Sequence, residues 1–179
     1  TAYGADGKLQ LKIEKTFAGE GGSSFAFDAT NIARDSSGRL MVKKFYKSIY
    51  ETANSYSVNF QNEDNEYTND SLTMVDLDNV TQIGEAVSGD SITAILGIPS
   101  YDQGERQLTW LKYKGIGLNE YYLVRTTLYS IELQVGQVGT ITEPRHGLSS
   151  QQCRLVKITA GPRGAIDLVL QKHADAAYS

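Results

Sequence analysis

Residues 152–172 read QCRLVKITAGPRGAIDLVLQK, and this stretch sets the fold class. In its second half Ile166, Leu168 and Leu170 occupy every other position, which is the period of a β-strand with one apolar face and one mixed face. The composition of residues 161–164, Gly-Pro-Arg-Gly, is typical of a tight turn. The chain is therefore predicted to end in a β-hairpin.

Similar β-prone runs extend from this hairpin back to the start of the chain. Residues 8–14 alternate polar and apolar side chains without a fault, and 55–60 alternate again before the run at 72–77, which predicts a hairpin-like pair. Polar or glycine-rich segments separate the runs. The complete set of expected strands is 8–14, 24–27, 39–45, 55–60, 72–77, 92–96, 120–132, 137–142, 152–159 and 165–172.

One helix is predicted in the middle of the chain. Ser100 followed three residues later by Gln103 fits a capping box, and Leu108 and Leu111 fall on one face of the helix that would follow. The helix is expected to run to about Lys114 and to stop at the Gly-Ile-Gly loop after it.

These elements predict a mainly β (α+β) fold, with short-stranded β-barrel or sandwich modules and one connecting helix. The expected division is a β-rich part at 1–98, the helix and its loop at 99–117, and a barrel-like part at 118–179. The whole could also be one compact domain. Because the chain begins at Thr1 without methionine, we expect it to be excised from a longer polypeptide, although processing would look the same.

Composition limits the possible functions. The chain has 179 residues, enough to bury a core, and its 17 basic against 21 acidic residues leave no positive excess for a nucleic-acid partner. Cys153 is the single cysteine and cannot form an internal disulfide. The apolar runs are too short to predict a membrane span, and no secretion signal is visible at the N-terminus.

No catalytic signature is present. The two histidines, His146 in a turn sequence and His173 near Asp175, belong to no HExxH spacing, and no serine stands in a GxSxG frame. Cys153 has no second thiol with which to form a metal or redox motif. The sequence therefore predicts a protein that is not an enzyme and that uses no cofactor.

Acidic residues gather at 63–66, with Asp70, Asp76 and Asp78 beyond them. Carboxylate oxygens of this kind could bind calcium, which accepts six to eight oxygen ligands. The segment lacks the ligand order and the glycine of an EF-hand, so a solvated hairpin loop is the alternative, and no metal site is assigned.

Eleven tyrosines are distributed along the chain, and tyrosine is enriched at protein interfaces. Strand packing accounts for most of them. Loops also carry variable contacts, which adds the turn at 144–150. The candidate interface residues are Tyr121, Tyr122, Tyr129, Arg145 and His146.

Six segments, read in order over roughly residues 28–179, resemble a family of phage tail-tip and baseplate hub proteins, the putative phage tail proteins related to tail host-specificity proteins. Two departures from the family pattern are Gly104, where the family usually has alanine, and Gln137, where it usually has aspartate. The segments are NSYSVNF at 54–60 with EDNEY at 63–67, the strand at 72–78, Gly97-Ile98 with YDQGER at 101–106, LQVGQVGTIT at 133–142, GLSS at 147–150 and CRLVKI at 153–158.

The resemblance implies a structural, hub-like β domain of a phage or prophage virion, near the distal end of the tail where the host is attached. It implies tail-tube, distal-tail and fibre proteins as partners, a homotrimer for the parent protein, and passage through the host cytoplasm during assembly. No catalysis is implied.

Two other functions remain open from the sequence. The first is a carbohydrate- or receptor-binding module of the tail, in which exposed tyrosines and Trp110 would stack on sugars. Trp110 shares the predicted helix with Leu108 and Leu111, which favours a role in the core or at an interface. The second is a tail-associated cell-wall hydrolase, which would need paired carboxylates, a metal site or a Cys/His pair.

Overall fold

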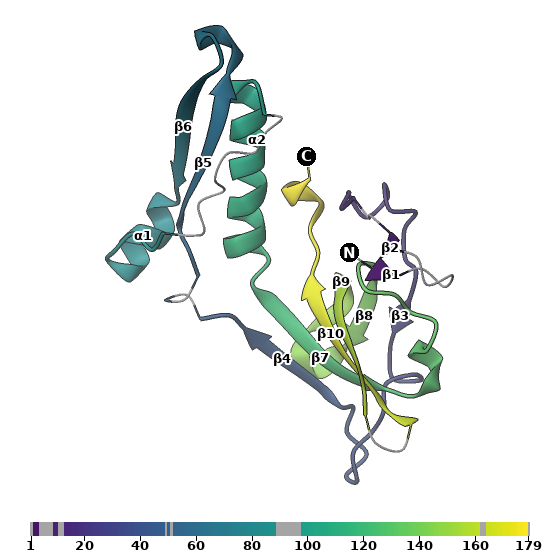
Figure 1. The fold of residues 1–179 in the computed structure, drawn as a ribbon. Coiled ribbons are helices and arrows are strands. Elements are labelled where there is room, and N and C mark those ends of the chain that lie inside the picture. The colour runs from purple at the N-terminus through teal and green to yellow at the C-terminus, as the bar shows by residue number, and fades with distance from the viewer. Residues whose placement is uncertain are drawn as a thin grey trace. The chain divides into compact units, whose positions relative to one another are not determined.

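A computed structural model of the chain describes residues 2–3, 9–10, 13–48, 50, 52–88, 98–161 and 164–178. They form mainly β-structure with two α-helices, which confirms the predicted α+β class (Figure 1). The chain divides into two units: the sheet unit, residues 1–46 with 120–179, and the hairpin unit, residues 47–119. This grouping differs from the expected division at 98 and 117. No helix among the described residues is long and apolar enough to cross a membrane.

The sheet unit is built on one six-stranded sheet with the strand order β3-β8-β9-β10-β7-β4. β3 and β8 are parallel, and every other neighbouring pair is antiparallel. β9 and β10 are the two strands of the predicted C-terminal hairpin. The bounds are β3 Ala26–Phe27, β4 Val42–Tyr46, β7 Glu120–Thr126, β8 Val138–Glu143, β9 Leu148–Ala160 and β10 Ile166–Lys172, with a separate pair β1 Ala2–Tyr3 and β2 Leu9–Gln10.

The sheet is open, so the expectation of a barrel was wrong. In the described part of the chain no ladder joins the edge strands β3 and β4, and a single bridge from Ile32 to Thr126 links the segment after β3 to β7. β3 ends after two residues because the chain turns at Asp28, whose carboxylate accepts a hydrogen bond from the backbone N–H of Thr30 at 2.8 Å. Such a short strand cannot close a barrel.

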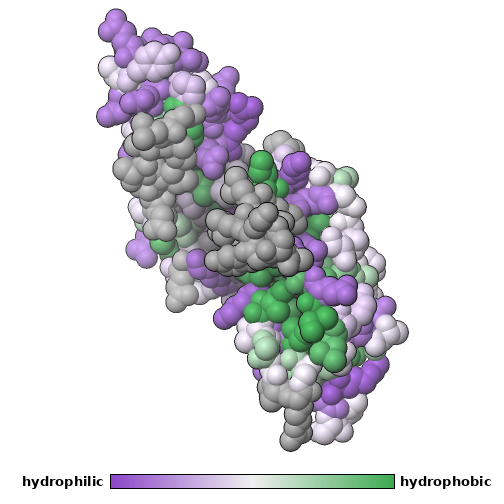
Figure 2. Space-filling model, turned by 45° about the vertical axis from the view of Figure 1, so that its right-hand side comes forward, coloured by the Kyte–Doolittle hydropathy of each residue, from purple (hydrophilic) through white to green (hydrophobic). Residues whose placement is uncertain are grey.

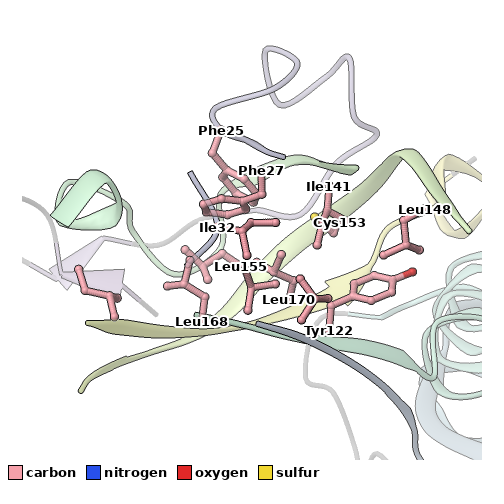
Figure 3. Packing of buried hydrophobic residues seen from close by; sticks show 13 residues of the cluster. Phe25, Phe27, Ile32, Tyr122, Ile141, Leu148, Cys153, Leu155, Leu168 and Leu170 are labelled. Atoms are coloured by element: carbon pink, nitrogen blue, oxygen red, sulfur yellow. The ribbon is translucent and has the colours of Figure 1, made fainter. Parts of the chain in front are cut away.

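Alternate residues of the strands fill one core on one face of the sheet (Figure 3). Ile166 and Leu168 of β10 are buried there, whereas Asp167 between them faces outward and is half-buried. Gly139 of β8 lies so close to Phe25 that an added Cβ would overlap the ring and the carbonyl oxygen of Phe25. Close approach of β3 to β8 therefore requires a glycine at this position.

The hairpin unit consists of β5 Ser55–Asn62 and β6 Thr68–Val75, antiparallel and joined by the turn η1 Glu63–Asn65. Alternate side chains of β5 are buried, as the sequence pattern predicted. The predicted hairpin is confirmed, and both strands extend further into the polar segment than the sequence indicated. The hydrophobic core cluster of this unit is formed by the buried residues Tyr56, Val58, Phe60, Ile98 and Leu108.

Helix α2, Tyr101–Lys112, lies along this hairpin (Figure 1). Ser100 is its N-cap residue, as predicted, but the Ser100 side chain makes no capping hydrogen bond. Leu108 is fully buried and Leu111 packs beside it against the hairpin core, which confirms the predicted contact face.

The helical structure does not stop at the predicted loop. It continues after α2 in a π-helical turn, η2 Tyr113–Gly117. A Cβ on Gly115 would overlap the hydroxyl of Tyr56, which donates a hydrogen bond to the carbonyl of Ala53 at 2.7 Å. The glycine in the predicted loop is needed instead for close packing of this turn on β5.

A second helix, α1 Leu77–Ile83, was not predicted. The predicted strand at 72–77 is divided between two elements, because β6 ends at Val75 and Asp76 caps α1 by accepting a hydrogen bond from the backbone N–H of Asn79 at 2.9 Å. The expected strand at 92–96 lies outside the described residues. Of the expected strand at 8–14, residues 9–10 form β2, and 13–14 have no regular structure.

Candidate functional site

The structure separates the adjacent candidates Tyr121 and Tyr122, because consecutive residues of β7 point to opposite faces. Tyr122 is fully buried, and its hydroxyl donates to Glu120 Oε1 at 2.8 Å. Burial raises the pKa of this phenol. Tyr121 faces outward and stacks on Phe45 of β4, with ring centres 5.5 Å apart. Of this pair, only Tyr121 lies at the surface.

Glu120, at the start of β7, links this strand to its two neighbours. Its carboxylate pairs with Lys44 of β4 and lies 3.4 Å from Lys172 of β10. Burial would raise the pKa of this carboxyl, but hydrogen bonds from Lys44 and Tyr122 outweigh that effect and hold its pKa below the ordinary value. This ionised cluster joins three neighbouring strands and has a structural role.

Tyr129 lies after β7, in the short turn η3 Leu128–Ser130, where the sequence predicted a continuing strand. Its ring is 56% exposed and meets Phe27 edge-on at 6.3 Å. Leu128, Ile131 and Val135 of the same segment are also exposed. Figure 2 shows a hydrophobic surface on this side of the sheet unit, and these exposed side chains contribute apolar surface of the kind that partners cover.

Arg145 and His146 line a pocket of about 400 Å³ on the sheet unit, which we call the sheet pocket. It is lined by the turn before β4 and by β4, β7, β10 and η4. Neither Tyr121 nor Tyr129 belongs to it. The lining residues are Asp35, Arg39, Leu40, Met41, Val42, Lys43, Leu123, Arg125, Arg145, His146 and Asp167.

An ion pair fixes one wall of the sheet pocket. Arg125 and Asp167 stand opposite each other on β7 and β10, and the guanidinium holds the carboxylate through two bonds of 2.6 and 2.7 Å. The hydrogen bonds from Arg125 lower the pKa of Asp167, and those to Asp167 raise the pKa of Arg125. Both groups therefore stay charged, and their planar pairing keeps them in place.

Two turns present the remaining charged residues. In η4, Pro144–His146, the carboxylate of Glu143 accepts a hydrogen bond from the backbone N–H of His146 at 2.8 Å. In the turn before β4, the carboxylate of Asp35 accepts from the backbone N–H of Arg39 at 2.9 Å, and hydrogen bonds from Ser37 and Arg39 lower its pKa. Both turns orient cationic side chains toward one pocket.

The charge of the sheet pocket is unbalanced. Its cationic residues are Arg39, Lys43, Arg125 and Arg145, against the carboxylates of Asp35 and Asp167. Within the described residues, Lys43 and Arg145 form no ion pair or side-chain hydrogen bond. The pocket can therefore accept an anionic group, with Leu40, Met41 and Leu123 as its apolar lining.

Most of this pocket was not predicted from the sequence. Arg145 and His146 were predicted from their loop, but Arg39, Lys43 and the pair Arg125 and Asp167 were not. A signal for the pair was present, because Asp167 lies between Ile166 and Leu168 in a predicted strand, and Arg125 follows Val124 in another. Their register across two strands that are distant in sequence could not be read from the chain.

His173 is buried among aromatic and charged side chains. It is 2% exposed, its ring stacks on Tyr178 at 5.2 Å and lies 6.2 Å from Phe17, and Nε2 is 3.3 Å from a carboxylate oxygen of Asp175. Burial and the nearby charge of Arg154 lower the pKa of the imidazole. This cluster packs the C-terminal segment against residues near Phe17.

The acidic residues considered for calcium are not gathered in one place. Asp76 caps α1 and pairs with Lys112 at 3.1 Å, whereas Glu63, Asp64 and Glu66 lie at the far turn of the hairpin. No group of three or more His, Cys, Asp or Glu side chains in the described segments is placed to hold a metal ion.

Comparisons with known proteins found similarity in structure alone. The amino-acid sequence matches no protein-family model and no curated protein. Among solved structures, a chain from the virion of a native gene transfer agent particle matches 88% of this chain with a TM-score of 0.67 and 13% identity, over 33% of its own length.

Two prophage proteins match with lower scores. The 43 kDa tail protein of prophage MuSo2 from Shewanella oneidensis matches 93% of this chain and 47% of its own length, at 13% identity and a TM-score of 0.47. The prophage tail protein gp18 from Listeria monocytogenes EGD-e matches 86% and 44%, at 10% identity and 0.40. The chain thus spans less than half of each of these three proteins.

Proposed function

We propose that this chain is a structural part of a phage or prophage tail, with a hub-like position at the tail tip. The observation that carries the proposal is the fold, which is shared over 88% of the chain with a component of a gene transfer agent virion. The ordered sequence motifs that resemble tail-tip proteins support the same assignment. Fold alone does not determine function, and the exposed surface gives further support to an assembly role.

The surface suits a protein that packs against other proteins. The apolar patch at Leu128, Tyr129, Ile131 and Val135 offers large exposed side chains of the kind that anchor interfaces. The sheet pocket adds a charged concave surface on the same unit. Tail-tube, distal-tail and fibre proteins are the proposed partners, in a parent protein that forms a trimer in the virion after assembly in the host cytoplasm.

We propose no catalytic role. The His173 ring is covered by aromatic neighbours, and the buried Cys153 thiol has a pKa raised by its apolar surroundings. A thiol with a raised pKa stays protonated near neutral pH and is a poor nucleophile.

The structure gives no particular support to glycan binding through Trp110. The ring is half-buried, and Nζ of Lys114 lies 4.5 Å from its centre. A sugar would have to displace this cation from the ring face, so the proposal stays with protein assembly.

Virion localisation tests the proposal. Particles purified from the encoding phage or prophage should contain the chain, and antibody-gold labelling should place it at the tip of the tail. Deletion of its coding segment should give particles with no tail or with an incomplete tip, and the wild-type chain supplied in trans should restore them. The proposal fails if the chain is absent from purified particles or if tails without it assemble normally.

A further inference from the structure

The turn of the β5–β6 hairpin carries three acidic residues and one aromatic residue, which we call the hairpin tip: Glu63, Asp64, Glu66 and Tyr67. All four side chains are exposed, and Tyr67 is 62% exposed. Large aromatic side chains at such exposure are common anchors in protein interfaces.

The backbone of the hairpin tip is held in a costly conformation. Glu66 and Tyr67 have φ values of 52° and 57°, a left-handed region that non-glycine residues seldom adopt in succession. Asn62 maintains it, because its carbonyl accepts from the N–H of Tyr67 at 2.8 Å and its side chain accepts from the N–H of Asp64 at 3.1 Å. The backbone of Glu66 and Tyr67 is thus held in this conformation by the turn.

The sheet pocket has the complementary character. Lys43 and Arg145 have no ionic partner in the described residues, and the pocket has an apolar lining that includes Leu40 and Leu123. Its volume of about 400 Å³ lies in the range of pockets that enclose a small organic group. A ligand that combines carboxylates with one aromatic ring would match both the charge and the lining.

We propose that the hairpin tip of one copy of this chain docks into the sheet pocket of a second copy. Tyr67 covers the apolar lining, and Glu63, Asp64 and Glu66 face Arg39, Lys43 and Arg145. Such a head-to-tail contact joins two different surfaces, so that repeating it builds a ring or a filament. The inference deepens the proposed assembly function, on which it rests, by naming a second copy as the partner of the sheet pocket.

Cross-linking between two single-cysteine variants tests the contact directly. Glu66→Cys and Arg145→Cys chains are mixed in equal amounts and oxidised gently, and the matched control pairs Glu66→Cys with Lys157→Cys, an exposed β9 lysine outside the pocket. Native Cys153 is buried with a raised pKa, so it does not compete. We expect about tenfold more heterodimer from the first pair, and equal yields from the two pairs would overturn the inference.

Charge reversal gives an independent measurement. Lys43→Glu with Arg145→Glu, and separately Glu63→Lys with Glu66→Lys, should each weaken self-association in sedimentation at low salt by at least about tenfold, and a mixture of the two variants should regain it. Circular dichroism and Trp110 fluorescence check that the variants are folded. A mixture that stays monomeric contradicts the contact.

The outcome can be separated from that of the proposed function. If the charge-reversed variants enter virions normally and the cysteine pairs cross-link equally, the docking of copies is wrong while the tail assignment stands. Absence of the wild-type chain from virions would instead remove the tail assignment.

Discussion

The sheet unit and the hairpin unit are stabilised in different ways. The sheet unit pairs strands from both ends of the chain, so its core joins residues as distant as Phe25 and Leu170. The hairpin unit uses one continuous segment, in which β5 pairs with the next strand and α2 covers both. Non-local pairing must recover more chain entropy before it stabilises. We therefore expect the sheet unit to depend on its large core and the hairpin unit on individual local contacts.

The largest expected effect is in the core of the sheet unit. Leu168→Ala removes a fully buried side chain of β10 and should lower the free energy of unfolding by about 2 to 5 kcal/mol. Hydrogen exchange measured on β9 and β10 peptides gives the local loss. Val156→Ala, at a side chain that is 41% exposed on β9, is the control and should change stability by less than about 0.5 kcal/mol. Equal effects of the two variants would contradict the core assignment.

In the hairpin unit, the largest loss of stability is expected from a change at one close contact, between Gly115 and Tyr56. Gly115→Ala places a methyl group on the hydroxyl of Tyr56 and should cost about 1 to 3 kcal/mol, because overpacking forces the π-helical turn away from β5. Trp110, the single tryptophan, reports unfolding of this unit by fluorescence.

Tyr56→Phe removes the atom that the methyl group would meet and should recover part of the loss in the double variant. If the single and double variants lose the same stability, the overlap with the hydroxyl is not the cause.

The two helix caps of the hairpin unit should differ in strength. Asp76→Ala removes a capping hydrogen bond and the pairing with Lys112, and should cost about 1 kcal/mol, whereas Ser100→Ala should cost only a few tenths because Ser100 makes no side-chain cap bond. Urea denaturation followed by Trp110 fluorescence compares them.

The Asp76 contribution should also depend on pH. The hydrogen bond from Asn79, and with it Lys112, lowers the pKa of Asp76 below the ordinary 3.8. A depressed carboxyl pKa stabilises the folded state above the unfolded pKa, and this stabilisation is lost as pH falls through the folded pKa. Asp76→Asn should reduce the loss of stability in acid, and an unchanged acid profile would exclude this contribution.

The last expected effect is a gain in stability. Gly104 lies in α2, where an added Cβ would make ordinary contacts, the nearest at 3.6 Å from a methyl group of Val58. Gly104→Ala should therefore stabilise the hairpin unit by about 0.5 to 1 kcal/mol, since alanine loses less entropy in a helix. A loss of stability would show that the helix lies closer to β5 than described.

The contrast between the units also explains which elements the sequence predicted. The β5–β6 hairpin and α2 were found because alternation at 55–60 and the pattern from Ser100 to Leu111 are local signals. Helix α1 was missed because its first residue, Leu77, continues the apolar period of β6 and its β-branched residues resemble a strand. The open form of the sheet was not predicted, because closure depends on the length of β3. That length is determined by pairing with β8, which is distant in the sequence.

The candidate surface was only partly predictable for the same reason. Adjacent tyrosines in one strand cannot both face outward, so the alternation of β7 already indicated that one of Tyr121 and Tyr122 is buried. It did not indicate which one. Arg145 and His146 were found from their turn. Lys43 and Arg125 enter the sheet pocket only through strand register, which no local pattern specifies.

The pairing of β4 with β7 has a consequence for engineering. Tyr46 and Glu120 stand opposite each other in this ladder, and the N–H of Lys47 donates to the carbonyl of Asn119 at 3.1 Å. The segment 47–119 therefore connects two antiparallel neighbouring strands, β4 and β7, whose adjacent ends a two-residue turn could join. Because the entropic cost of closing a loop grows slowly with its length, this connection should tolerate inserted segments of very different length. It is a natural graft point for a reporter domain or a foreign binding loop.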